Sequence, residues 1–251
     1  MLMRENKNNK QISFNIPDIT TDGMLKKVWM SVNGVSTLIK AGAVAESDRK
    51  NLLSANEIAV TEIANLLGIN HVQYYPVKIS NKYEDMMCAC SCFINTPDSD
   101  AITMLQIIHE NYKYSKTGIV NFYKEIGAEN EYYQMLFLNA LVGNFDRHEK
   151  NIMFNKDFHT GEYSLLPIFD SGSSLAYFSE YDDMIKPLYL NRQEQIRYTY
   201  RHVQDCVKRI DEDVVKDIIR QTYEMFGIDE KLYKKAVNVV DYGIKAVKTC
   251  E

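Results

Sequence analysis

Four runs rich in strand-forming residues occupy much of the first third of the chain, at 26–34, 35–42, 73–80 and 85–94. The first two meet at Asn33-Gly34, a dipeptide that takes positive φ angles readily and marks a tight hairpin turn. Between the second and third runs, residues 54–69 place isoleucine and leucine at helical spacing and reach Gly68, a helix stop. The pattern predicts four strands and one helix in this part of the chain.

After residues 95–100 the pattern becomes helical along most of the remaining chain. The expected helices are 103–112, 119–126, 131–142, 213–226 and 230–248, with short strands at 151–155 and 164–169. A β-rich first third before a helix-rich remainder predicts an α+β fold of two lobes with a cleft between them. We place the boundary near residue 95, so that residues 1–95 form the N-terminal lobe and residues 96–251 the C-terminal lobe.

Composition and charge narrow the function classes. With 251 residues, 45% hydrophobic and 25% charged, the chain has the make-up of an ordinary soluble protein. Its formal net charge of −5 gives no basic footprint, which argues against direct nucleic-acid binding. The polar N-terminus lacks the apolar core of a secretory signal, and no apolar run is long enough to predict a membrane span. We therefore expect a cytoplasmic protein without membrane contact.

Three cysteines alternate along the expected strand 85–94, so that Cys88, Cys90 and Cys92 point to one face. We interpret them as reduced core thiols. The alternative is a soft-metal site, which no Cys-x-x-Cys or Cys/His spacing supports. Reduced thiols agree with a cytoplasmic location.

The stretch most suggestive of chemistry is GNFDRHEKN at residues 143–151, followed by Asp170 after an apolar run. Phosphoryl transfer from ATP needs an oriented hydroxyl, positive charge near the transferring group, and Mg²⁺ on the phosphates. Mg²⁺ prefers oxygen ligands and keeps several waters, so one carboxylate and one amide are a typical protein contribution. Asp146, Asn151 and Asp170 fit such a site, and the alternative is a polar loop that solvates itself.

These stretches resemble the HipA-like serine/threonine kinases, in a short form of that family. The resemblance rests on LVGNFDRHEKNIMF at 141–154 and LLPIFDSGSSL at 165–175. The same stretches are more distantly similar to the Asp-Arg-His-x-x-Asn and Asp-Phe-Gly signatures of phosphatidylinositol kinases. Upstream, residues 20–30, 38–42 and 56–69 match the family's nucleotide loop, its lysine-bearing strand and the following helix. The resemblance implies a bilobed protein-kinase-like fold.

Carried over to the second half of this sequence, the resemblance implies that Asp146 orients the substrate hydroxyl and accepts its proton. A carboxylate of ordinary pKa suffices if that proton moves late in a loose transition state. Asn151 and Asp170 would hold Mg²⁺, and Arg147 would brace the loop. His148 would touch the γ-phosphate of ATP, with a structural hydrogen-bonding role as the alternative. The remaining histidines are interpreted as surface or packing residues: His71, His109, His159 and His202.

In the first half, the resemblance implies that Lys40 reaches the α- and β-phosphates of ATP and is braced by an acid on the next helix. Glu57 is preferred over Glu62 for that acid because it follows Asn56. The alternatives are a solvated strand lysine for Lys40 and, for Glu57, an acid stabilised by the dipole at the helix start. The hinge whose backbone meets the adenine would be the strand end Cys92, Phe93 and Ile94.

The expected nucleotide loop departs from the usual kinase pattern, because the sequence contains no Gly-x-Gly-x-x-Gly. Asp22 and Gly23 mark the loop, and the segment around Thr20 and Thr21 would supply further phosphate contacts. In HipA-like kinases a hydroxyl near this loop is autophosphorylated. The candidates in this chain are Ser13, Thr20 and Thr21.

The resemblance therefore implies an ATP- and Mg²⁺-dependent kinase that phosphorylates a serine or threonine of a protein and autophosphorylates. The resemblance also allows a toxin-type kinase that acts on a translation component. The long members of the family meet a DNA-binding antitoxin through an extra N-terminal region. This chain begins almost at the nucleotide loop, which leaves room for a small, separate antitoxin-like partner. The alternatives are a small-molecule or lipid kinase of the same fold, and a nucleotide-binding pseudokinase that acts as a regulator.

Overall fold

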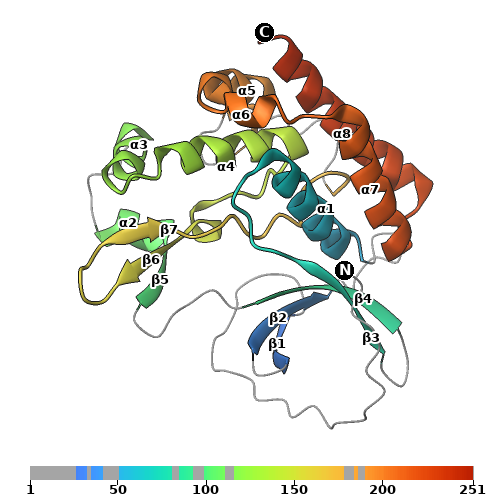
Figure 1. The fold of residues 1–251 in the computed structure, drawn as a ribbon, viewed down its shortest axis with the longest axis horizontal. Coiled ribbons are helices and arrows are strands. Elements are labelled where there is room, and N and C mark those ends of the chain that lie inside the picture. The colour runs from blue at the N-terminus through green and yellow to red at the C-terminus, as the bar shows by residue number, and fades with distance from the viewer. Residues whose placement is uncertain are drawn as a thin grey trace.

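The computed structural model describes residues 27–32, 35–41, 51–80, 85–92, 99–110, 116–177, 184–185 and 190–250. Within these ranges, a four-stranded sheet lies on one side of a larger group of helices, as Figure 1 shows. The expected lobe boundary near residue 95 falls outside the described residues and stays a prediction.

The strands predicted in the first third are confirmed, and they form one antiparallel sheet in the order β1-β2-β4-β3. Their bounds are β1 Lys27–Val32, β2 Val35–Ala41, β3 Tyr75–Ser80 and β4 Asp85–Cys92. β3 lies at an edge of the sheet, where Pro76 is tolerated although it has no backbone N–H to donate. Lys40, near the end of β2, pairs with Lys27 on one side and Ala89 on the other, which places it in the middle of the sheet.

The predicted helix between these strands is also confirmed as α1 (Leu52–Leu67). It ends at Gly68, whose φ of 71° allows its N–H to bond the carbonyls of Ala64 and Asn65. Residues of α1 are buried around most of its circumference, because β4 packs on one side and α7 (Glu212–Phe226) on another. α1 therefore links the sheet to the group of helices.

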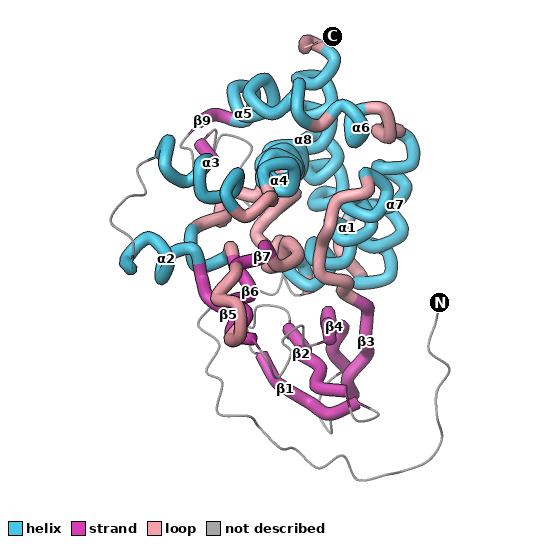
Figure 2. The backbone as a smooth tube through the Cα atoms, turned by 60° about the vertical axis from the view of Figure 1, so that its left-hand side comes forward, coloured by secondary structure: helices cyan, strands magenta, loops and turns pink. Residues whose placement is uncertain are grey.

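The helical part is built around α4 (Glu129–Val142), in which residues 135–142 are all buried. α3 (Lys116–Glu125), α5 (Arg192–Thr199) and α8 (Glu230–Lys248) pack against it, as Figure 2 shows with α4 seen end-on. A helix enclosed in this way needs apolar residues on all faces, which the sequence of α4 supplies. The predictions of helices at 131–142, 213–226 and 230–248 are confirmed.

A second antiparallel sheet, in the order β5-β6-β7, lies beside the helices. Its strands are β5 Ser99–Thr103, β6 Met153–Asp157 and β7 Tyr163–Leu165. The strands predicted at 151–155 and 164–169 were misplaced at their ends. β6 begins later because Glu149–Asn151 form the 3₁₀ turn η2, and β7 stops short of Pro167, which cannot donate to a ladder.

The remaining elements are α2 Met104–Glu110, η3 Tyr200–His202, α6 Gln204–Val207, β8 Met184–Ile185 and β9 Leu190–Asn191. α5 was not predicted because it carries few apolar residues. It begins with a capping box between Asn191 and Glu194, a signal that its sequence does contain.

Among the described residues, no helix is both long and apolar enough to cross a membrane. Cys90 is half-buried, while the side chains of Cys88 and Cys92 lie outside the described part.

Candidate active site

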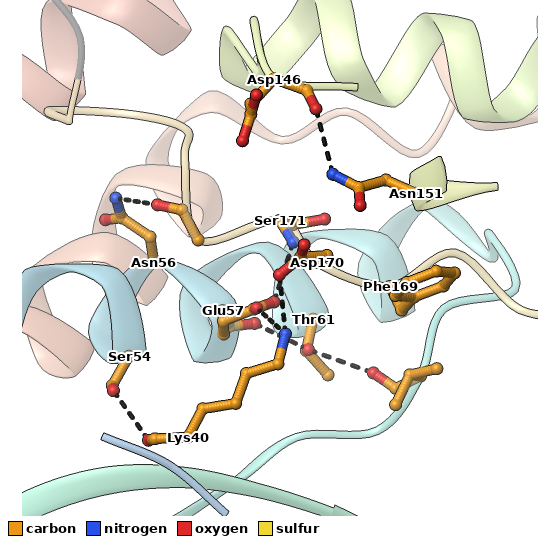
Figure 3. A network of polar contacts seen from close by, with 12 residues as sticks. Lys40, Ser54, Asn56, Glu57, Thr61, Asp146, Asn151, Phe169, Asp170 and Ser171 are labelled. Carbon is orange, nitrogen blue, oxygen red and sulfur yellow. Dashed lines mark hydrogen bonds and ion pairs between the residues drawn. The ribbon is translucent and has the colours of Figure 1, made fainter. Parts of the chain in front are cut away.

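The centre of the candidate site is Lys40, which extends from β2 toward α1 and the segment around residue 170 (Figure 3). Its Nζ donates to Glu57 Oε1 at 2.6 Å and to Asp170 Oδ1 at 2.8 Å. Ser54 Oγ donates to the Lys40 carbonyl at 3.1 Å, so α1 also holds the backbone of the strand. Glu57, and not Glu62, is the acid of α1 that meets the lysine.

Burial and charge compete at this lysine, which is 2% exposed. Burial by itself lowers the pKa of Lys40. The negative charge of Glu57, with smaller contributions from Tyr74 and Asp170, outweighs burial and holds the pKa well above its usual range. Lys40 therefore stays positively charged in a place where an unpaired ammonium would be very costly.

Asp170 stands where the chain leaves the bridge between Ile168 and His71. Its φ of 56° lies in the left-handed region, which Asp tolerates better than most residues and which is common at functional sites. The next residue, Ser171, donates its backbone N–H to Glu57 Oε2 at 2.9 Å. The Asp170 side chain is 29% exposed, so it can reach a ligand while it contacts Lys40.

Asp146 and Asn151 come from the turn that follows α4. That turn starts at Gly143, whose φ of 67° caps α4, and Asn144 Oδ1 then accepts the N–H of Asp146 at 3.2 Å. Asn151 Nδ2 donates to the Asp146 carbonyl at 3.1 Å, which fixes the amide with its Oδ1 turned away from that bond. Figure 3 shows Asp146 and Asn151 together on the side of Asp170 opposite Lys40.

Arg147, whose side chain is fully buried, holds this turn in place from the interior of the protein. Its Nη1 donates to the Asn151 carbonyl at 2.8 Å and to the Phe169 carbonyl, and its Nη2 donates to Ser171 Oγ at 3.2 Å. The guanidinium thus joins the 146–151 turn to the 169–171 segment, which is the bracing expected of it. Because all of these acceptors are neutral, Arg147 holds the two segments together without forming an ion pair with Asp146 or Asp170.

His148 has a local structural contact. Its Nδ1 accepts the backbone N–H of Lys150 at 3.2 Å and so caps the 3₁₀ turn η2. The side chain is half-buried, which leaves its other nitrogen open to the role at the γ-phosphate that the resemblance implies. Both interpretations of His148 are compatible with this geometry.

The donors present at the site fit Mg²⁺. Asp170 offers a carboxylate and Asn151 an amide oxygen, and both are the hard oxygen ligands that Mg²⁺ prefers. In the described part of the chain, no three His, Cys, Asp or Glu side chains form a cluster suited to a metal. A metal held by two side chains would complete its shell with water and phosphate oxygens, which is usual for Mg²⁺ and unusual for Zn²⁺.

Several residues that build the site were not singled out from the sequence. Asn56 Nδ2 donates to the carbonyls of Gly172 at 2.9 Å and Ser174 at 2.7 Å, while its Oδ1 accepts from Tyr223 of α7 at 2.7 Å. These partners lie 116 to 167 positions away along the chain, so no local pattern reveals them. An asparagine in the interior of a helix, where this residue type is not favoured, was the one available signal.

Other predicted site residues lie outside the described part. Asp22, Gly23, Phe93 and Ile94 are not described, and neither are the phosphorylation candidates Ser13, Thr20 and Thr21. The backbone of Cys92 pairs with Thr37 at the end of β4. The roles of the nucleotide loop and the hinge therefore remain predictions.

A sheet with a buried, ion-paired lysine, joined through one helix to a helical part that carries an aspartate turn, defines a kinase-like fold. The chain belongs to the HipA-like C-terminal domain family, whose model matches residues 19–227. This confirms the predicted resemblance and the α+β bilobed fold class.

Solved structures agree with this assignment. The proinflammatory kinase CtkA of Helicobacter pylori superposes with a TM-score of 0.63 at 17% identity, over 89% of this chain and 93% of that chain. HipA of Shewanella oneidensis, solved with HipB and its operator DNA, gives a TM-score of 0.63 at 13% identity, over 93% of this chain and 65% of HipA. At these identities the likeness establishes the fold alone.

In sequence, the chain is 29% identical over 82 residues to the serine/threonine-protein kinase CtkA of Helicobacter pylori strain J99. That alignment spans 33% of this chain and 25% of the relative.

Proposed function

We propose that this protein is an ATP- and Mg²⁺-dependent serine/threonine protein kinase of the HipA-like type. The observation that carries the proposal is the pairing of Lys40 with both Glu57 and Asp170, next to the turn that bears Asp146 and Asn151. Kinases need this lysine–glutamate pair and a metal-binding aspartate in place together. The family and the CtkA relative support the same activity.

In this proposal each side chain has one task. Lys40 binds the α- and β-phosphates, and Glu57 keeps it charged and directed. Asp170 and Asn151 would hold Mg²⁺, which when bound neutralises charge on the phosphates. Asp146 positions the acceptor hydroxyl. As the γ-phosphorus forms its bond to that oxygen and the bond to the ADP oxygen breaks, the hydroxyl proton passes to Asp146.

The finer parts of the proposal rest on the named relatives and on the family resemblance of the sequence. One relative is named a serine/threonine-protein kinase, and HipA was solved with HipB. We therefore extend the proposal to a protein substrate, to autophosphorylation at Ser13, Thr20 or Thr21, and to a small antitoxin-like partner. A translation component is the substrate class to examine first, in the manner of a toxin-type kinase.

The test uses labelled ATP with Mg²⁺ and compares the native chain with Asp146→Ala and Asp170→Ala. Asp205→Ala is the matched control, because its carboxylate is 90% exposed and, within the described part of the chain, bonds only to Lys208 nearby. We expect both site variants to lose transfer to the chain itself and to a cell lysate, and the control to retain it. Calorimetry should show weaker Mg²⁺-dependent nucleotide binding for Asp170→Ala and near-native binding for Asp146→Ala.

Other outcomes discriminate among the alternatives. A native chain that binds ATP without transferring phosphate to any acceptor would be a pseudokinase. Transfer to a lipid or a small molecule, with none to protein, would keep the fold and change the acceptor class. Full transfer by Asp146→Ala would refute the role given to that carboxylate.

A further inference from the structure

His71 lies where the segment after α1 meets the loop segment that leads to Asp170. It is 4% exposed and forms a parallel bridge with Ile168. Two backbone bonds flank it, from the Val72 N–H to the Ile168 carbonyl at 2.7 Å and from the Ile168 N–H to the Asn70 carbonyl at 3.0 Å. The ring is therefore held against the 168–171 segment by the backbone on both sides.

Both ring nitrogens of His71 have a partner. Nδ1 lies 2.7 Å from the Val72 carbonyl, and Nε2 lies 3.0 Å from Ser171 Oγ. Because a carbonyl only accepts, Nδ1 carries the proton and Nε2 of the neutral ring is an acceptor. The Ser171 hydroxyl then donates to Nε2, and its oxygen accepts from Arg147 Nη2 at 3.2 Å. Arg147, Ser171 and His71 thus form a directed chain of hydrogen bonds.

This chain joins both segments that carry the proposed metal ligands. Ser171 follows Asp170 directly, and its backbone N–H is bound by Glu57. Arg147 holds the carbonyl of Asn151 with the other arm of its guanidinium. The Ser171 hydroxyl, which donates to His71 and accepts from Arg147, therefore ties the segment that carries Asp170 to the turn that carries Asn151.

We propose that His71 is a positioning residue of the phosphotransfer site, which acts through the Ser171 hydroxyl and Arg147 to hold Asp170 and Asn151 in metal-binding geometry. This inference rests on the function proposed above. It assigns His71 no contact with ATP or the acceptor. Partners of metal ligands at this distance commonly change metal affinity or activity by about 10- to 100-fold when they are removed.

The test is a double-mutant cycle with Ser171→Ala, His71→Phe and the double variant. Ser171→Ala deletes one buried oxygen and keeps the backbone bond to Glu57. The control is Thr199→Val, which deletes a buried hydroxyl of α5 whose bonds, among the residues that the structure describes, go to carbonyls of its own helix. For each protein, calorimetry measures ATP affinity with Mg²⁺ and with chelator, and steady-state kinetics separate kcat from KM.

We expect each single variant to lose about 10-fold or more of the Mg²⁺-dependent gain in ATP affinity and of kcat. Affinity measured with chelator should stay within about twofold of native, since Lys40 is untouched. The double variant should be no worse than the more affected single variant, because both substitutions break the same chain. Thr199→Val should keep native values even if its thermal unfolding midpoint drops.

Two results would overturn the inference. One is a native Mg²⁺-dependent gain in folded Ser171→Ala, and the other is a double variant whose loss equals the product of the two single losses. If His71→Phe does not fold, Ser171→Ala decides the question alone. A native chain that neither binds Mg²⁺·ATP nor transfers phosphate would refute the proposed function together with this role, so the two failures are distinguishable.

Discussion

Acid should destabilise this protein through His71, and the size of the effect follows from its surroundings. Burial lowers the pKa of His71 from its ordinary value of 6.5 to about 4. The hydrogen bond to Val72 opposes this, while the positive charges of Arg147 and Lys40 add to it. A proton on the ring would also replace the Nε2 acceptor by a donor that faces the Ser171 hydroxyl.

The sign is set by which state binds the proton first. With a pKa of 6.5 in the unfolded chain and about 4 in the folded one, the unfolded state takes up the proton first as the pH falls. The stability contributed by neutral His71 is complete above the unfolded value and is lost as the pH drops toward the folded value. At about 1.4 kcal/mol per pKa unit, the loss is about 2 kcal/mol at pH 5 and about 3 kcal/mol at pH 4.

Urea denaturation of the native chain and of His71→Phe across this pH range measures the effect. Titrating carboxylates act on both proteins, so they cancel in the difference between the two free energies of unfolding. We expect that difference to shift by about 2 kcal/mol in favour of the variant between pH 7.5 and pH 5. Parallel curves for the two proteins would show that His71 is not buried as a neutral ring, and would refute the reasoning.

Three further substitutions, one of them with a matched control, test the contacts around the site, each by urea denaturation. Glu57→Gln should cost about 3 kcal/mol, because it removes one of the two carboxylates from a buried ammonium, while the exposed Glu62→Gln should stay within about 0.5 kcal/mol of native. Tyr223→Phe should cost about 1–3 kcal/mol by leaving Asn56 Oδ1 without its donor, and a native midpoint would contradict that bond. Gly243→Ala should cost about 1–3 kcal/mol, since its Cβ would meet a backbone oxygen at 2.8 Å; an unchanged stability would mean that α4 and α8 can separate freely.

The sequence was most informative where the chemistry is local. Asp146 and Asn151 lie in one turn, and Asp170 follows an apolar run, so their spacing can be recognised from the sequence alone. α1 and α8 could be bounded closely because helical periodicity and terminal glycine or acidic residues act within a few positions. The strand predictions near the site were less accurate. β7 ends before Pro167, which cannot donate to a ladder, and β5 was not predicted because it depends on pairing with β6.

What the sequence concealed are contacts between distant segments. His71 was interpreted as a surface or packing residue, yet it bonds to Ser171, 100 positions away. Its own neighbours in sequence give no hint of that partner. Tyr223 looks like an ordinary apolar-face residue of an amphipathic helix, and only the packing of α7 on α1 brings it to Asn56. Polar residues on apolar helix faces were the useful signal, since burial obliges each of them to find a partner.

The segment from Phe169 to Ser174 is held from three directions by polar groups that are themselves buried. Glu57 binds the Ser171 N–H, Asn56 binds the Gly172 and Ser174 carbonyls, and Arg147 binds the Phe169 carbonyl. Each of these groups would be costly if left unpaired, so any movement of the segment must break several bonds at once. The aspartate at its start is therefore held in place before a ligand arrives, and such preorganisation is what an electrostatic catalyst requires. Under the proposed function, a lysine already paired with that aspartate must give up part of the contact to receive phosphate, so we expect Lys40 to move more than the other groups of this site when nucleotide binds.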